Sequence, residues 1–350
     1  MKKLSLAALF SALIMFTVSG AVEQQPSKRY TVMFYNLENF FDTINQPDVL
    51  DEEFTPEGPK QWNSYKYNAK LSNIEKVLYN ISAENKAFPT VIGVSEIENR
   101  NVMEDLAALP KLQRANYQIV HYDSPDRRGV DVAFLYRPDQ FRYEGSATIP
   151  VVVPGLTDFR TRDIVTMWGT IEDEPFYFMV AHWPSRLGGQ AASAFKREAT
   201  AAIMKRAADS VVQLNPATKI VMMGDFNDDP TDASIAEILD AKQKTSDLQP
   251  GGLFNPFNQM HRDGLGTLAY RDSWNLFDNI VISESLVNPE PGTLGIYKQP
   301  KDRYYGHIYK RPYLLQQSGQ YKGYPLRTYV GNDFQGGYSD HFPVFIFIAK

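Results

Sequence analysis

The stretch Lys219–Pro230, KIVMMGDFNDDP, joins a short apolar run to a dense group of acidic and amide side chains. The run from Ile220 to Met223 stops at a glycine, which indicates a buried strand followed by a turn. Asp225 and Asn227 come next, two residues apart, so both are expected on one side of the rim of a sheet. A carboxylate and an amide held there can deprotonate a water or hold a phosphate. The same residue types also favour an Asx-turn without chemistry, and this stretch alone leaves both interpretations open.

Other apolar runs of the chain also meet polar residues where a strand is expected to end or begin. The polar residues at strand ends are Asn36 and Glu38, Glu96, His182, and Asp225 with Asn227. Those at strand starts are Asp278, and Asp340 with His341. In an antiparallel pair the start of one strand lies beside the end of the next, so these residues can share one rim. The mixture of ends and starts predicts mixed or antiparallel sheets.

Each of these residues alone has a simpler explanation. A single acid at a strand end usually faces solvent, and a single histidine is more often a satisfied core or surface group. An EF-hand calcium loop starting at Asp225 is excluded, because it needs glycine at its sixth position and glutamate at its twelfth. Those positions are Pro230 and Ala236. Six strand ends carrying such residues together favour a functional cleft.

The N-terminus has the pattern of a signal peptide. Lys2 and Lys3 precede an apolar run at 4–18, and the small residues 19–21 follow it. This pattern predicts cleavage near residue 21 and export to the periplasm or the extracellular space. The alternative is a membrane anchor, for which the run is short. No second run is long enough to span a bilayer, so no stable membrane span is expected after cleavage.

The composition limits the chemistry. The 350 residues contain no cysteine, which excludes disulfides, thiolate metal sites and cysteine nucleophiles. Any metal would be bound by oxygen and imidazole, which favours Mg²⁺ or Mn²⁺, with Ca²⁺ as a further candidate. Loss of two signal lysines would move the formal net charge from -5 to -7. Such an acidic balance argues against a surface that attracts nucleic acid everywhere.

We expect one domain over 28–350 and a monomer, and we infer no protein partner.

The rest of the chain alternates helical and strand-like patterns without repeats. Helices are predicted at 64–82, 102–109, 191–214 and 232–241. Further strands are predicted at 117–121, 130–136, 141–153 and 163–172. Residues 243–272 are rich in turn signals.

Residues 297–329 carry eight tyrosines and a formal charge of about +6. That segment is either a nucleic-acid-binding excursion, with Lys310 and Arg311 contacting substrate, or a polar flap whose tyrosines pack on the sheet.

Seven segments resemble the endonuclease/exonuclease/phosphatase superfamily, the metal-dependent phosphoesterases built like deoxyribonuclease I. They are FYNLEN (34–39), VIGVSEIEN (91–99), RGVDVAFLY (128–136), AHWPSR (181–186), GDFND (224–228), WNLFDNIVIS (274–283) and GGYSDHFPV (336–344). They follow the order of the family and span most of residues 30–348. GDFN with a downstream SDHFP is a specific signal, whereas NLEN alone is weak. Ser95 departs from the glutamine that many members carry.

The resemblance implies a four-layer α/β/β/α sandwich of two mixed sheets with the site at one end. It also implies hydrolysis of a phosphoester by direct attack of water. A divalent metal would bind Glu96, helped by Glu38, Asn36 and Asp340, and Asp225 would orient or deprotonate the water. The remaining expected catalytic residues are Asn227, His182, and His341 paired with Asp278. Arg128 and Arg186, within the family motifs, are expected to contact substrate.

The substrate class stays open. Export and the basic, tyrosine-rich segment favour a nuclease acting on nucleic-acid phosphodiesters. The alternative is a phosphatase or phosphodiesterase for small or lipid-headgroup phosphoesters, which the acidic balance also allows. A third interpretation, a non-catalytic binding protein on the same scaffold, would require key groups to be missing, and they are present.

Overall fold

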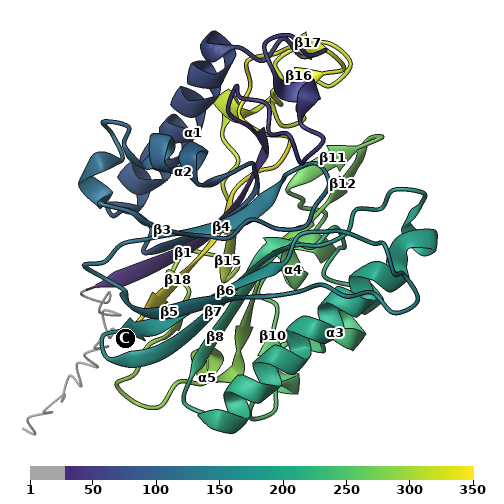
Figure 1. Ribbon diagram of the computed structural model, residues 1–350. Coiled ribbons are helices and arrows are strands. Elements are labelled where there is room, and N and C mark those ends of the chain that lie inside the picture. The colour runs from purple at the N-terminus through teal and green to yellow at the C-terminus, as the bar shows by residue number, and fades with distance from the viewer. Residues whose placement is uncertain (1–27) are drawn as a thin grey trace, which may run out of the picture.

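The computed structural model describes residues 28–350, and the predicted signal peptide lies outside them. Two seven-stranded sheets pack face to face, and helices cover their outer faces, as Figure 1 shows. Both sheets are mixed. The predicted four-layer α/β/β/α sandwich is therefore confirmed.

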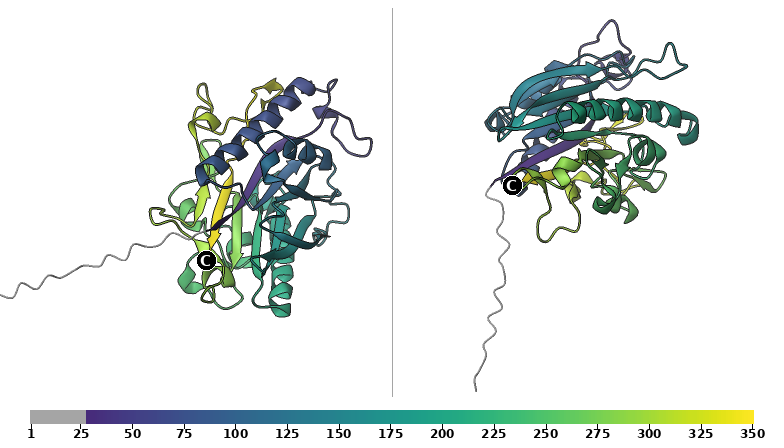
Figure 2. Two further views of the ribbon diagram at one scale, coloured as in Figure 1. Left: turned by 90° about the vertical axis from the view of Figure 1, so that its left-hand side faces the viewer. Right: turned by 90° about the horizontal axis from the view of Figure 1, so that it is seen from below.

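The first sheet has the strand order β14-β18-β1-β2-β4-β3, and β15 also pairs with β18. Its strands are β1 (Arg29–Phe40), β2 (Val91–Ile97), β3 (Gln118–His121), β4 (Asp131–Tyr136), β14 (Gly295–Tyr297), β15 (Gly306–Ile308) and β18 (Val344–Ala349). β1 runs parallel to β2 and antiparallel to β18, so the first and last long strands of the described chain lie side by side at its centre. Figure 2 shows them as purple and yellow neighbours beneath α1.

The second sheet has the order β5-β6-β7-β8-β13-β10-β9. Its strands are β5 (Arg142–Ile149), β6 (Ile164–Ile171), β7 (Glu174–His182), β8 (Lys219–Asp225), β9 (Ala241–Lys242), β10 (Leu253–Phe254) and β13 (Asp278–Ser283). β8 lies parallel to β7 and antiparallel to β13. The end of β8 therefore lies beside the end of β7 and the start of β13.

Three apolar layers hold the sandwich together. The central layer joins the inner faces of the two sheets, with Phe34 and Val91 on one side and Phe178 and Val221 on the other. The outer face of the first sheet packs on α1 (Ser64–Asn85) and α2 (Arg100–Ala107). The outer face of the second sheet packs on α3 (Gln190–Leu214) through residues such as Met204. The alternation of side chains along each strand supplies both faces.

Short elements complete the fold. They are the helices α4 (Asn258–Arg262) and α5 (Glu284–Val287), the 3₁₀ turns Glu52–Phe54, Gln113–Ala115, Thr245–Asp247 and Pro312–Leu314, and the hairpins β11 (Leu268–Tyr270) with β12 (Ser273–Asn275) and β16 (Tyr329–Val330) with β17 (Asp333–Phe334).

The predicted helix at 232–241 is shorter than expected and forms a π-helical turn, Ser234–Ile238. The strand expected at 141–153 covers only Arg142–Ile149. The tyrosine-rich segment 297–329 is only in part a flap. Its β15 pairs with β18 and belongs to the first sheet. Across residues 28–350, no helix combines the length and apolar character that crossing a bilayer requires.

Candidate active site

Three predicted residues lie in one row at the rim of the second sheet. The strand register pairs His182 with Asp225 and Asp225 with Asp278. All three side chains are buried, with at most 6% of each residue exposed. The row forms because β8 has one parallel and one antiparallel neighbour, which the sequence pattern of strand ends and starts predicted.

The first sheet contributes the opposite side of the cleft. The Asn36 amide Nδ2 donates to Asp225 Oδ2 over 3.0 Å and lies 3.4 Å from Glu96 Oε1. Asn36 pairs in register with Ser95, which places Glu96 next to it at the end of β2. Ser339 donates its hydroxyl to the Asn36 backbone carbonyl over 2.7 Å and so ties the SDHFP segment to β1. One amide side chain therefore joins the rims of both sheets.

Four residues of the site have left-handed backbone conformations. The φ angles are +48° at Glu38, +50° at Asn39, +58° at Glu96 and +52° at Asn227. The pairing of β1 with β2 shifts register between Asn36 and Phe40, at the first two of these residues. Such bulges redirect side chains at the end of a strand. A left-handed conformation costs about 1–2 kcal/mol for each residue other than glycine or asparagine, so Glu38 and Glu96 are held in place against local strain.

The two histidines have opposite electrostatic environments. Burial lowers the pKa of His182 well below its ordinary value, and the cations Arg162 and Arg128 lower it further. Burial also opposes charge on His341, but the carboxylates of Asp278 and Asp225 outweigh it and raise its pKa well above the ordinary value. His341 Nδ1 lies 2.7 Å from Asp278 Oδ2. The surroundings therefore disfavour a positive charge on His182 and favour one on His341.

Asp225 lies where these groups converge. Its Oδ2 is 3.6 Å from His182 Nε2 and 3.8 Å from His341 Nε2. Burial raises the pKa of Asp225 to about 7, against the lowering effect of His341. Its other oxygen, Oδ1, accepts from the backbone N–H of Asn227 over 2.9 Å. A carboxyl with a pKa near neutrality and a fixed orientation suits a general base.

The donor atoms of Glu96, His182 and Asp225 all lie within 4.8 Å of one another. The two carboxylates supply oxygen ligands of the kind that Mg²⁺ and Mn²⁺ prefer, and the imidazole supplies a nitrogen ligand of the kind that Zn²⁺ or Fe²⁺ accepts more readily. Sequence reasoning placed Glu96 among the metal ligands but gave His182 only a role at the phosphate. Its Nδ1 has no hydrogen-bond partner among the described residues.

The carboxylates of Glu38 and Asp340 lie beside this centre and are held by a residue that sequence reasoning did not single out. Arg327 donates Nε to Glu38 over 3.1 Å and Nη2 to Asp340 over 2.8 Å. Glu38 also accepts from the backbone N–H of Thr328 over 2.7 Å. The fully buried Lys70 lies 3.9 Å from Glu38. Lys70 had a signal in the sequence, because it falls on the apolar face of the helix with Ile74.

Arg162 is a second residue of the site that no sequence pattern singled out. It is buried and donates to the backbone carbonyls of His182 and Trp183 over 3.2 and 2.8 Å. A 2.9 Å ion pair with Asp126 balances its charge. It thus fixes the end of β7. Asn227 donates to the same Trp183 carbonyl over 3.0 Å, which orients its amide.

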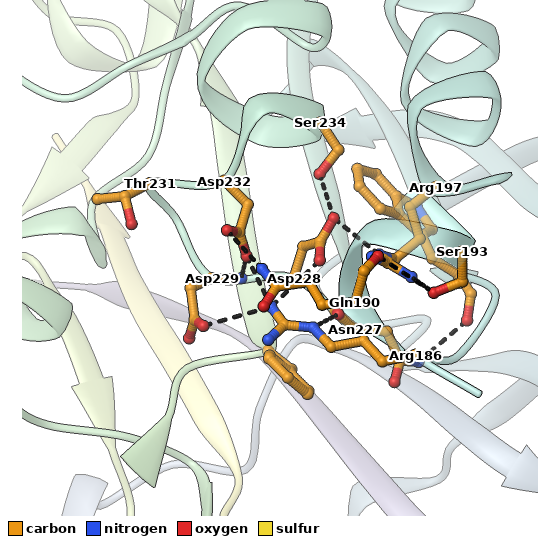
Figure 3. Close-up of polar contacts among 12 residues, drawn as sticks. Arg186, Gln190, Ser193, Arg197, Asn227, Asp228, Asp229, Thr231, Asp232 and Ser234 are labelled. Carbon is orange, nitrogen blue, oxygen red and sulfur yellow. Dashed lines mark hydrogen bonds and ion pairs between the residues drawn. The ribbon is translucent and has the colours of Figure 1, made fainter. Parts of the chain in front are cut away.

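The predicted substrate-binding cations differ in their surroundings. Arg186 is only partly exposed, and Figure 3 shows its guanidinium among the carboxylates of Asp228, Asp229 and Asp232. Its Nε also donates to the backbone carbonyl of Asn227 over 2.8 Å. Arg186 therefore supports the GDFND turn. Asp228 also pairs with the buried Arg197 and accepts from Ser234, so it links the turn to α3 and to the π-helical turn.

The other three cations have partners of their own, and Arg128 is close enough to His182 to lower its pKa. Arg128 is half-exposed and 3.5 Å from Asp126. Arg311 is paired with Glu84 on α1. The Lys310 ammonium lies 4.1 Å from the centroid of the Trp274 ring. Their roles toward a substrate stay predictions.

Comparison with known proteins identifies the family of the chain. A family model described as "Endonuclease/Exonuclease/phosphatase family" matches residues 31–350. A search of curated proteins finds no significant match. Among solved structures, a humanized D. rerio TDP2 is 14% identical with a TM-score of 0.52, covering 92% of this chain and 99% of the other.

Two further structures have similar scores. The human Nocturnin catalytic domain with bound sulfate is 14% identical, with a TM-score of 0.52 and coverage of 92% and 94%. The Bacteroides thetaiotaomicron mannosyl-6-phosphatase Bt3783 is 15% identical, with a TM-score of 0.51 and coverage of 92% and 100%. At these identities the likeness shows the fold alone, whereas the family match spans nearly all described residues. The chain therefore belongs to the endonuclease/exonuclease/phosphatase family of phosphoester hydrolases.

Proposed function

We propose that this protein is a divalent-metal-dependent hydrolase of nucleic-acid phosphodiesters that uses direct attack of water. The observation that carries the proposal is the convergence of His182, His341 and Asn36 on one oxygen of Asp225. Burial raises the pKa of this Asp225 carboxyl to about 7. It lies beside the cationic His341 and near Glu96, the proposed metal ligand. This combination of a base, a cation and a metal donor suits attack on a phosphoester.

Glu96 is the principal metal donor in this proposal, with Asn36 beside it. The donor atom of His182 lies within 4.8 Å of that of Glu96 and can join it at one ion, whereas Asp225 handles the attacking water. Glu38 and Asp340, which now accept from Arg327, are further residues that would hold the cation. When bound, the cation supplies neutralisation of negative charge on the phosphoryl and leaving oxygens.

The chain's own residues perform the remaining tasks. Asp225 Oδ2 accepts a proton from the attacking water, and the Asn227 N–H holds the other carboxyl oxygen in place. His341 turns Nδ1 toward Asp278, which leaves Nε2–H to donate to a phosphate oxygen. The neutral His182 either donates to a phosphate oxygen from the opposite side or acts as a metal ligand. Such fixed donors are typical of sites that stabilise charge developing in a transition state.

The test uses Asp225→Ala and His341→Ala in the full mature chain, assayed on plasmid, RNA and bis(4-nitrophenyl) phosphate with Mg²⁺ or excess EDTA. Loss of the base should reduce kcat by about 10²–10⁴-fold. Loss of the cationic donor should reduce it by about 10²–10³-fold. The matched control is Asp333→Ala, an exposed aspartate of β17, which should retain wild-type rates. Full activity in either site variant, or in EDTA, would sink the assignment.

A second candidate, hydrolysis of small phosphoesters, is favoured by the presence of a compact cavity of about 460 Å³ whose lining includes Arg327. Parallel assays on hexose phosphates and sphingomyelin separate it from nuclease action. Higher kcat/KM on a small phosphate than on any nucleic acid would select this candidate.

We also propose that the chain is exported and loses residues 1–21. The support is the sequence pattern of two lysines, an apolar run and small residues. Expression of the full chain in a Gram-negative host, followed by fractionation and N-terminal sequencing, tests this. A mature N-terminus near residue 22 in the periplasm or medium is expected, and an intact Met1 in the cytoplasmic fraction would contradict it.

A further inference from the structure

A cavity of about 460 Å³ lies between the β11–β12 hairpin and the segment 316–331. Twelve residues form its walls: Ala269, Tyr270, Arg271, Asp272, Gln316, Gln320, Tyr321, Tyr324, Pro325, Arg327, Val330 and Gly331. The volume falls in the range of pockets that bind small organic groups. None of the residues predicted from the sequence to bind substrate contributes to it.

The walls of the cavity are fixed to each other. The Tyr324 hydroxyl donates to Asp272 Oδ1 and accepts from the Asp272 backbone N–H, both over 2.6 Å. Arg271 and Asp272 have φ angles of +48° and +62°, which form the tight turn between β11 and β12. Trp274 on β12 lies 6.2 Å from the Tyr324 ring, centroid to centroid. The cavity is therefore built by long-range contacts and not by a loose loop.

Three of the twelve lining residues are tyrosines, and two of these remain accessible. Tyr270 is 62% exposed and Tyr321 is 42% exposed. In contrast, Tyr309 of the same tyrosine-rich segment is buried and donates to Glu84. The two interpretations of that segment thus apply to different tyrosines. Tyr309 packs on the fold, whereas Tyr321 is partly exposed and lines the cavity.

Arg327 connects the cavity to the reaction centre. Its side chain lines the cavity and at the same time donates to Glu38 and Asp340. A smaller cavity of about 180 Å³ shares Arg327 and Gly331 with the larger one and is lined by Glu38. A group covalently bonded to a phosphate at the metal-binding carboxylates could therefore extend past Arg327 into the larger cavity.

We propose that this cavity binds one unpaired nucleobase of the strand whose phosphodiester is hydrolysed, which makes the enzyme selective for single-stranded nucleic acid. The inference rests on the proposed function and specifies its substrate. Every base has a π-face that stacks on tyrosine. The amides of Gln316 and Gln320 and the guanidinium of Arg271 can bond to base edges. A base that stays paired inside a duplex cannot enter such a cavity.

The binding test uses the full mature chain in EDTA and a short single-stranded oligonucleotide with one 2-aminopurine, whose fluorescence falls when it stacks. Wild-type protein should quench the probe. Tyr321→Ala and Tyr270→Ala should each weaken binding by about tenfold, the order expected for one stacked base. The control is Tyr79→Ala on α1, because Tyr79 is also 42% exposed and does not line the cavity. It should bind as the wild type does.

The kinetic test compares kcat/KM for an oligonucleotide with that for an abasic strand of the same length, in Mg²⁺. The wild-type ratio should be about ten, and it should fall toward one in Tyr321→Ala. A wild-type ratio of one, or quenching that survives both tyrosine variants, would overturn the inference. Displacement of the probe by a hexose 6-phosphate but not by a nucleoside monophosphate would assign the cavity to a sugar and overturn it too.

The two proposals fail in different ways. A protein that binds the probe through Tyr321 but hydrolyses no phosphodiester retains the nucleobase cavity and loses the proposed activity. A protein that cleaves base-bearing and abasic strands equally retains the activity and loses the nucleobase cavity.

Discussion

His341 Nδ1 lies 2.7 Å from Asp278 Oδ2, and the register of β8 with β13 places that aspartate directly beside Asp225. Asp278 therefore orients the His341 imidazole and favours its positive charge. Asp225, its neighbour in the sheet, remains available to bind water. The Asp278 side chain is fully buried, so its effect is not screened by solvent.

Asp278→Asn should separate the charge effect from the packing effect. The amide keeps the shape of the carboxylate but removes the attraction that opposes burial, so the pKa of His341 should fall. We expect kcat to drop by about 10²-fold or more because a neutral imidazole stabilises the phosphate less well. NMR titration of His341 in metal-free protein checks the direction. A pKa that stays well above the ordinary value would contradict the assigned role of Asp278.

Arg186→Ala should behave as a loss of structural support. The substitution leaves Asp228, Asp229 and Asp232 without their shared cation, so unfolding should become easier by about 2 kcal/mol. The half-exposed Arg128, replaced in the same way, should change stability much less. Thermal melts and kcat/KM, measured together, distinguish structural support from substrate contact. An unchanged melting temperature with a selectively raised KM would instead support the substrate contact predicted from the sequence.

Glu98→Gln should stabilise the protein at alkaline pH. Burial raises the pKa of Glu98 to about 8, and the nearby carboxylates of Asp42 and Asp51 add to the effect. The folded state thus holds this proton more tightly than the unfolded chain, and stability falls as the pH rises from about 4.5 to 8. The variant should gain about 2 kcal/mol at pH 8 and little at pH 4.5. Urea unfolding in EDTA at both pH values measures this, and an equal gain at both would refute it.

Gly224→Ala should be far more disruptive than the same change at Gly93. A Cβ at Gly224 would lie 2.1 Å from the carbonyl oxygen of Ala181 in the neighbouring strand, which cannot move alone. At Gly93 the nearest atom, at 2.5 Å, is the sulfur of the flexible Met223 side chain. We expect about 3 kcal/mol or more of destabilisation at Gly224 and about 1 kcal/mol at Gly93. Comparable losses in urea unfolding would argue against this difference between backbone and side-chain contacts.

The sequence predicted the part of the site that local patterns determine. Apolar runs that stop at Asn36, Glu96, His182 and Asp225 identified strand ends, and the sheet pairing brought these residues together. Alternation and turn signals act over a few residues, so they are readable without the fold. The extension of β1 to Phe40 through a bulge was not readable, because the bulge depends on pairing with β2.

The partners of the predicted residues could not be read from local patterns. Arg327 contacts Glu38 across 289 positions of sequence, and Arg311 reaches Glu84 across 227. Ion pairs of this kind depend on how distant segments cross in the folded chain. The local charge of Lys310 and Arg311 predicted a binding surface. The open cavity instead has Arg271 and Arg327 in its walls, because its lining depends on how distant segments meet.

The left-handed backbone at Glu38, Glu96 and Asn227 has a consequence for how this protein would respond to selection. Glycine adopts such a conformation freely, so Glu96→Gly would relieve local strain while deleting the proposed metal donor. A library screened for heat resistance alone would therefore enrich inactive chains at the positions that matter most for catalysis. Directed evolution of a more durable form must impose activity and heat challenge in the same round.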